Sequence, residues 1–257
     1  MRHGYIDSHS GIGSFVHKLD PRVKFIATIL LIISIVLTKP ASYISFSLYG
    51  ILIGLLIALS RIPIGFIFKR SLIVIPFVLV AAVFIPFIKK GEVACAYSFG
   101  MIDLTVTYEG LAVLWNVLIK SYLSVLCLIL LISSTKFSNL LKALEGLRCP
   151  KIFIMILSFM YRYIFILMDE LMRMKTAKDA RSGAGERNWR VIRALANILG
   201  VLFVRAYERG ERIYLAMCSR GFDGSVNTLN DLRLRAADVC FFVIFTASVF
   251  MIRSIGN

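Results

Sequence analysis

Acidic residues are scarce in this sequence: 15 Asp and Glu stand against 30 Lys and Arg, so the formal net charge is +15. No pair of carboxylates lies within any of the long apolar runs. Carriers driven by proton or sodium gradients use ionisable side chains at membrane depth, and this shortage argues against such a mechanism. The phosphate-binding pattern GxxxxGK[ST] is missing as well, so a transporter with this sequence would have to use the ATPase of a partner.

Signatures of catalysis and of metal or disulfide frameworks are also missing. The sequence has no GxSxG or HExxH motif, and Gly11-Ile12-Gly13 lacks the third glycine of a dinucleotide loop. Its five cysteines lie far apart without a CxxC pair, so we interpret them as small core residues. Three histidines near Asp7 could hold a metal, but without a scaffold we expect them to be solvated: His3, His9 and His17. We therefore expect no cofactor, no metal site and no catalytic residue.

Apolar residues, in contrast, are abundant. Of the 257 residues, 58% are hydrophobic, and the mean hydropathy is +0.80. This composition is too apolar for one soluble core and indicates a membrane protein with several spans. The excess of Lys and Arg then fits basic cytoplasmic loops beside anionic membrane lipid, so we expect no nucleic-acid partner. The polar first 24 residues lack the order of a cleavable signal peptide.

Five apolar stretches predict membrane spans. A helix start precedes the first of them: we expect Asp20 to be the N-cap and Pro21 the first helical residue. Pro76 and Pro86 predict kinks in the third span. The five predicted spans are residues 22–38, 41–60, 71–88, 110–135 and 236–252.

The segments between these spans carry most of the charge. We expect a short basic loop at residues 61–70 and a mixed-charge loop at residues 89–109. Lys120 is the one charged residue in the fourth apolar stretch. An ionisable residue at membrane depth is a candidate functional residue. We expect Lys120 to be structural instead, placed near the headgroups or against a polar neighbour.

The distribution of basic residues indicates which stretches cross the membrane. An apolar run at residues 151–168 is split by Arg162, and a strongly basic segment follows it. If that run spanned the bilayer, the basic segment would lie outside, against the positive-inside rule. We therefore predict four transmembrane helices in residues 22–135 and a final one in residues 236–257. The N-terminus, residues 1–21, and a helical block, residues 136–235, would be cytoplasmic.

Both long helices expected in this block end with an arginine near a glycine. Their endings are Ala180-Arg181-Ser182-Gly183 and Cys218-Ser219-Arg220-Gly221. A cation in the last turn followed by glycine is ordinary helix-stop chemistry. A guanidinium at the tip of a rigid helix can also enter a groove of a partner and form forked hydrogen bonds. A short amphipathic helix, capped by Ser138, should precede the two long ones.

Five motifs spread over most of the chain point to one family. They are Leu19-Asp20-Pro21-Arg22-Val23-Lys24, Tyr161-Arg162-Tyr163, Asp169-Glu170, Arg205-Ala206-Tyr207-Glu208-Arg209-Gly210-Glu211-Arg212 and Ser219-Arg220-Gly221-Phe222-Asp223-Gly224. Together they resemble the T component of energy-coupling factor (ECF) transporters, and most of all its cobalt-transporter type, CbiQ. The last motif is the most specific.

The resemblance implies an all-α membrane protein with about five transmembrane helices and a cytoplasmic coupling domain of one short and two long crossed helices. Such a subunit is not an enzyme; it joins two cytoplasmic ABC-type ATPases to a substrate-binding S component in the plasma membrane of a prokaryote. The implied substrate is cobalt, with nickel or a vitamin as alternatives, because the metal ligands would lie in the S component.

The same resemblance assigns roles to residues. Two arginine triplets would dock the ATPases, and they depart from the family pattern only by a serine each: Ala180, Arg181, Ser182 and Ser219, Arg220, Gly221. Arg162, Ala206 and Gly210 would be packing positions of the coupling helices, since Ala206 and Gly210 form a small-residue face.

Two other functions stay open at this point. A self-sufficient permease would need polar residues along a pathway at the membrane midplane, and few exist beyond Lys120. A membrane enzyme of lipid metabolism would need clustered acids or histidines near the interface, and the histidines are confined to the N-terminus.

Overall fold

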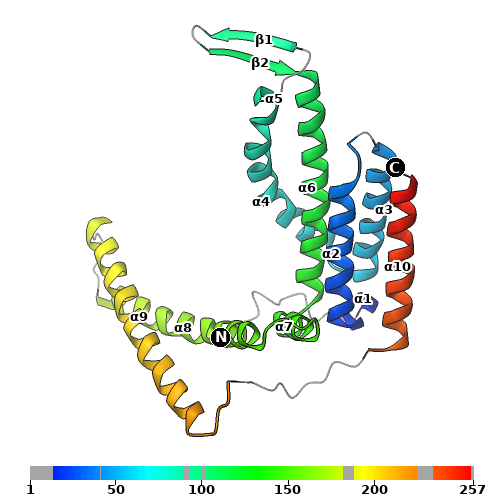
Figure 1. Cartoon of the computed structure of the whole chain (residues 1–257). Coiled ribbons are helices and arrows are strands. Elements are labelled where there is room, and N and C mark those ends of the chain that lie inside the picture. Colours follow the sequence, from blue (N-terminus) through cyan, green and yellow to red (C-terminus); the bar gives the residue numbers. More distant parts are fainter. Residues whose placement is uncertain are drawn as a thin grey trace. The chain divides into compact units, whose positions relative to one another are not determined.

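The structure is a computed structural model that describes residues 14–40, 42–88, 93–99, 102–181, 188–224 and 234–255. The chain divides into two compact units. One unit, here called the membrane unit, contains α1 (Phe15–Lys18), α2 (Pro21–Leu37), α3 (Tyr43–Ser60), α4 (Ile64–Val83), α5 (Ile85–Ile88), β1 (Val93–Phe99), β2 (Ile102–Thr107), α6 (Tyr108–Ser134), most of α7 (Phe137–Gly146) and α10 (Ala236–Ile255). The other, the α8–α9 unit, contains α8 (Lys151–Arg181) and α9 (Asn188–Cys218) (Figure 1).

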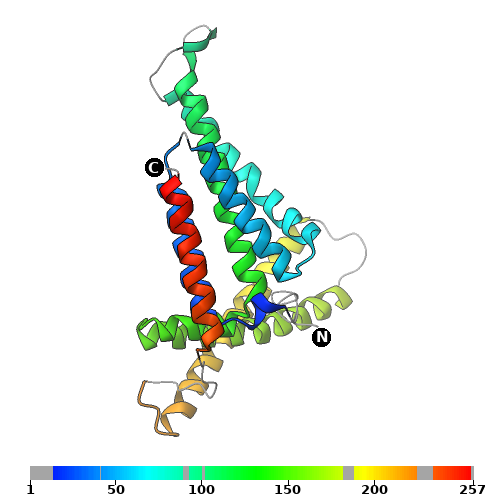
Figure 2. The same ribbon diagram turned by 90° about the vertical axis from the view of Figure 1, so that its right-hand side faces the viewer.

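The core of the membrane unit lies among α2, α3, α6 and α10, which run side by side (Figures 1 and 2). Its most buried large side chains are Leu31, Ile35, Tyr49 and Ile53. Lipid tails are as apolar as leucine, so close packing stabilises these helices in a membrane more than exclusion of water does.

The start of α2 is as predicted. The Asp20 side chain accepts a hydrogen bond of 2.8 Å from the backbone N–H of Arg22, and Pro21 is the first helical residue. The cap therefore satisfies one of the free N–H groups at the helix start, where proline needs no partner.

The third predicted span differs at its beginning. α4 begins at Ile64, so Lys69 and Arg70 lie within a helix and the predicted basic loop at residues 61–70 is wrong over most of its length. The guanidinium of Arg70 lies over the ring of Phe66, one turn earlier, at 4.9 Å from the ring centroid. The cation–π contact stabilises the charge of Arg70 on the face of α4, so this basic residue can lie within a helix.

The two prolines of this span behave differently. Pro76 lies inside α4, which continues without a break. The chain does break before Pro86, because α4 ends at Val83 and a short helix, α5, resumes at Ile85. Only the second proline therefore marks an interruption of the helix.

The predicted mixed-charge loop at residues 89–109 is also wrong over most of its length. β1 and β2 pair in antiparallel fashion, with an irregularity of the register between Val93 and Cys95. Residues 102–107, with the sequence IDLTVT, alternate apolar and polar side chains, which is the period of a strand.

The junction between α5 and α6 is unusually tight. The hydroxyl of Thr107 accepts a hydrogen bond from the backbone N–H of Gly110 and donates one to the carbonyl of Pro86. A Cβ atom added to Gly110 would lie 2.6 Å from the Cα of Pro86. Glycine at this position therefore allows the start of α6 to lie directly against α5.

The α8–α9 unit contains the two long helices that the sequence predicts. They cross, and Arg205 of α9 forms an ion pair with Glu170 of α8 (Figure 1). The short helix before them, α7, begins at Phe137, and the carbonyl of Lys136 accepts from the N–H groups of Asn139 and Leu140. The prediction of Ser138 as its cap was therefore wrong, since Ser138 lies inside the first turn.

Four of the described helices are long and apolar enough to cross a membrane: α3, α6, α8 and α10. The chain is thus an all-α membrane protein, and the hairpin is the one exception among the residues that the structure describes. α8 qualifies because its first half is apolar, although only 6% of that stretch is buried within the chain. Composition alone therefore does not separate α8 from a span, and its cytoplasmic placement stays a prediction from charge.

Candidate docking sites

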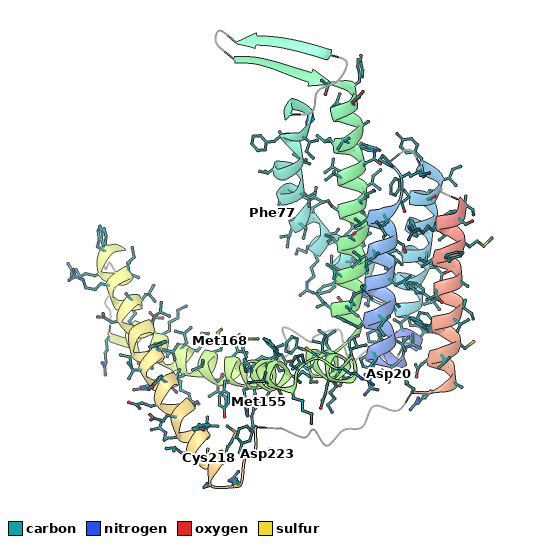
Figure 3. All side chains as sticks on the ribbon, viewed as in Figure 1. Asp20, Phe77, Met155, Met168, Cys218 and Asp223 are labelled. Atoms are coloured by element: carbon teal, nitrogen blue, oxygen red, sulfur yellow. The ribbon has the colours of Figure 1, made fainter. Side chains whose placement is uncertain are left out.

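The end of α9 holds Arg220 in a defined backbone conformation. The N–H of Phe222 bonds to the carbonyl of Met217 at 3.1 Å, and the N–H of Gly221 bonds to that of Cys218, also at 3.1 Å. Gly221 has φ of +78°, so these bonds form a Schellman cap with glycine in the left-handed conformation. Figure 3 shows this end of the helix, between Cys218 and Asp223.

The side chain of Arg220 is available to a partner. Arg220 is exposed, and its guanidinium has no hydrogen-bond or ion-pair partner among the described residues. Ser219, the neighbouring member of the triplet, donates from its hydroxyl to the carbonyl of Ala216 and so caps the same turn. The rigid cap and the free guanidinium together can present five N–H donors at a fixed position.

The first triplet lies at the end of α8. Ala180 and Arg181 are the last two residues of that helix and both are exposed, while Ser182 lies outside the described residues. Within the described part of the chain the guanidinium of Arg181 has no counter-ion. Arg181 lines a cavity of about 390 Å³, which α9 completes.

The predicted packing positions lie on both long helices. Arg162 is exposed on α8, Ala206 is half-buried on α9, and a Cβ added to Gly210 would meet nothing within 4 Å. Their packing role stays a prediction, and a polar contact between the two helices is the ion pair of Glu170 with Arg205. Both residues belong to motifs singled out from the sequence, but nothing in a sequence pairs two residues 35 positions apart.

Large apolar side chains cover both long helices without being buried in the chain. Met168 of α8, labelled with Met155 in Figure 3, is about half exposed, and Phe203 of α9 is 73% exposed. Other exposed members of this set are Phe153, Ile156, Met160, Ile164, Leu195, Leu199 and Tyr207. Exposed apolar surface of this extent marks a protein or membrane contact.

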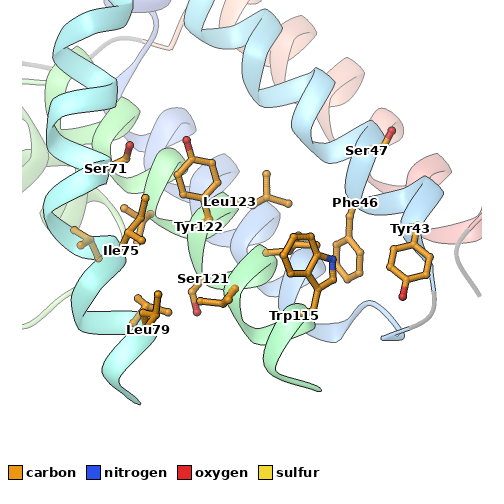
Figure 4. A pocket seen from close by; sticks show the side chains of 15 residues that line it. Tyr43, Phe46, Ser47, Ser71, Ile75, Leu79, Trp115, Ser121, Tyr122 and Leu123 are labelled. Atoms are coloured by element: carbon orange, nitrogen blue, oxygen red, sulfur yellow. The ribbon is translucent and has the colours of Figure 1, made fainter. Parts of the chain in front are cut away.

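A groove on the membrane unit was not predicted from the sequence. It has a volume of about 510 Å³ between α3, α4 and α6, and Phe46, Trp115 and Tyr122 lie along it (Figure 4). Its other lining residues are aliphatic apart from Tyr43 and three serines. A groove of this composition holds hydrocarbon better than ions or water.

The buried charges of the membrane unit gather at helix ends. Among the described residues of that unit they are Asp20, Lys24 and Asp238, each at most 7% exposed. The Asp238 carboxylate accepts from the backbone N–H groups of Asp20, at 3.0 Å, and Arg235, at 2.9 Å. This cluster therefore joins the first turns of α2 and α10.

The described residues contain no group of three or more His, Cys, Asp or Glu side chains that could hold a metal ion. His17 is engaged in a contact between its Nδ1 and the hydroxyl of Ser14, at 2.6 Å. His3, Asp7 and His9 lie outside the described residues.

Comparison with known proteins gives a consistent result. The family model described as the cobalt transport protein, CbiQ, matches residues 13–229. The energy-coupling factor transporter transmembrane protein EcfT of Brevibacillus brevis is 31% identical over 260 residues, covering 95% of this chain and 93% of its own. The EcfT of Ruminiclostridium cellulolyticum is 29% identical over 239 residues, covering 88% and 87%. That of Streptococcus thermophilus is 28% identical over 225 residues, covering 82% of each chain.

Proposed function

Because the chain belongs to the cobalt transport protein family CbiQ, we propose that it is the membrane coupling subunit of an ECF importer in a prokaryotic plasma membrane. In this role it catalyses nothing itself. Two cytoplasmic ABC-type ATPases bind to it and hydrolyse ATP, and an S component in the membrane binds the substrate.

The observation that carries this proposal is the pair of free arginines at the ends of two long helices. Arg181 ends α8 and Arg220 occupies the cap of α9, and neither guanidinium has a partner within the described residues. An arginine whose backbone is already fixed binds at a lower entropic cost, because it loses little further conformational freedom on docking. Each end supports the docking of one ATPase.

The long helices would transmit motion between the partners. ATP binding would move the two ATPases and with them the ends of α8 and α9, while the apolar residues nearer the start of α8 would contact the S component. The ion pair of Arg205 with Glu170 joins the two helices. Movement of one end would therefore change the position of the other helix.

Cobalt ion is the substrate that we propose, from the description of the matching family. The ion would be held by the S component. Nickel and vitamins remain the alternatives, since the EcfT relatives are named for coupling and not for a substrate.

A self-sufficient permease fits the structure less well. Such a protein would need polar groups along a path through its spans. The buried charges described for the membrane unit lie at helix ends, and the groove between α3, α4 and α6 is apolar.

Replacement of each arginine by lysine tests the proposal. Lysine retains the charge for lipid but loses the planar fork that binds carboxylates and carbonyls at two points. We expect Arg181→Lys and Arg220→Lys to weaken retention of the ATPases or to uncouple ATP hydrolysis from uptake, with the chain still inserted in the membrane. Unchanged retention and uptake in both variants would contradict the docking role.

A further inference from the structure

The two arginines differ in their surroundings. Arg220 lies at an exposed cap of a single helix. Arg181 shares a cavity with residues of both long helices. Its polar walls are Lys178 and Arg181 from α8, and Asn197 and Arg205 from α9.

The charges at this cavity leave one guanidinium uncompensated. Lys178 is paired with Asp179 at 3.6 Å, and Arg205 is paired with Glu170. Arg181 is the remaining cation in the wall, and the described residues supply no carboxylate to it. One acidic side chain of a partner protein would neutralise the charge of Arg181.

The rest of the lining favours a side chain over a lipid headgroup. Asn197 adds an amide that can donate to a carboxylate, while Ala177, Ala194, Ile198 and Val201 form an apolar surface. A volume of about 390 Å³ has room for one long side chain with part of its helix or loop.

We infer that the ATPase bound at the end of α8 inserts an acidic side chain into this cavity, so that α8 and α9 hold it together. The ATPase at Arg220 is held by the end of α9 alone. This inference rests on the proposed function and makes the two docking sites unequal. Motion of the first ATPase acts on both long helices, and therefore on the way they cross.

Filling the cavity tests the inference without removing a charge. Ala194 lines it and is half-buried, whereas Ala196, two residues along the same helix, is exposed and lies outside it. Ala194→Phe is therefore the test variant and Ala196→Phe its matched control. Asn197→Leu, similar in size to the native residue, is a second test variant that keeps the space and removes the donor.

The measurement is the number of ATPase subunits per chain in the complete complex purified from membranes, by native mass spectrometry. We expect Ala194→Phe, Asn197→Leu and Arg181→Ala each to weaken one ATPase about 30-fold or more, so that one of two is lost. Ala196→Phe should retain both.

Three outcomes would overturn the inference, and they can be told apart. If Arg181→Ala loses an ATPase while Ala194→Phe and Asn197→Leu keep both, the arginine docks outside the cavity. If the cavity variants lose anionic lipid and keep both ATPases, the cavity binds a headgroup. If both ATPases persist in Arg181→Ala and in Arg220→Ala, the proposed function itself fails.

Discussion

Lys24 of α2 and Lys120 of α6 each donate hydrogen bonds to backbone carbonyls at the C-terminal end of the other lysine's helix. The ammonium of Lys24 donates to the carbonyl of Ser134, the last residue of α6, at 3.3 Å. The ammonium of Lys120 donates to the carbonyls of Val36 and Thr38, at the end of α2, at 2.9 and 2.7 Å. Each helix thus supplies a cation to the C-terminal end of the other, where the helix dipole is negative.

Lys120→Met should lower stability slightly and leave transport near normal. The lysine has the polar neighbour expected from the sequence, in the form of carbonyl groups, and its ammonium also lies 5.9 Å from the ring centroid of Phe46. A cation at a helix C-terminus contributes about 1 kcal/mol. Thermal unfolding of the purified chain and cobalt uptake by cells measure the two effects. Abolished uptake in an intact complex would make Lys120 part of the mechanism.

Lys24→Met should be more damaging than Lys120→Met. Lys24 is 7% exposed and interacts electrostatically with the buried Asp20 and Asp238. Removal of one partner from a buried group of charges costs about 3 to 5 kcal/mol. We therefore expect a much lower melting temperature for the Lys24 variant in the same assay. Equal melting temperatures for the two variants would contradict the charge cluster at the start of α2.

Gly110→Ala should disturb the junction of α5 with α6. The added methyl group would lie 2.6 Å from the backbone of Pro86, which cannot move away as a flexible side chain could. Overpacking of this kind costs about 1 to 3 kcal/mol. Gly54→Ala in α3 is the matched control, since nothing lies within 4 Å of its added Cβ. The account predicts a lower melting temperature for the first variant only.

Labelling of single cysteines tests the predicted topology. Ser225 and Asn257 lie on either side of the last predicted span and would report its orientation, but both lie outside the described residues. Two nearby described positions are used for the labelling instead. The native Cys218 is exposed, and Ser254 lies in the last turn of α10. In chains with one cysteine, an impermeant maleimide added to intact cells should label Ser254→Cys and spare Cys218. Labelling of Cys218 from outside would place the end of α9 outside the cell and contradict its predicted cytoplasmic position.

The sequence predicted the helices well where local chemistry and period agree. Asp20 followed by Pro21 is a strong start signal, and long apolar runs of about 20 residues locate α3, α6 and α10 closely. The hairpin was missed because the charges flanking residues 93–107 suggested a loop, although the alternation in residues 102–107 was a usable signal.

The sequence did not predict contacts between residues that lie far apart along the chain. Glu170 with Arg205, and Lys24 with Ser134, depend on how helices pack and not on any spacing in the chain. The cavity beside Arg181 has the same origin, since α8 and α9 each provide part of its wall. The sequence could therefore predict that both arginines end helices, but not that their surroundings differ.

The most direct test of the account is the chain in which both arginines proposed to dock the ATPases are replaced, Arg181→Ala with Arg220→Ala, purified from membranes with whatever ATPases it retains. The account predicts an inserted chain without bound ATPases and without cobalt uptake, because each free guanidinium supports one docking site. A double variant that retains two ATPases and transports normally would contradict the coupling role of α8 and α9.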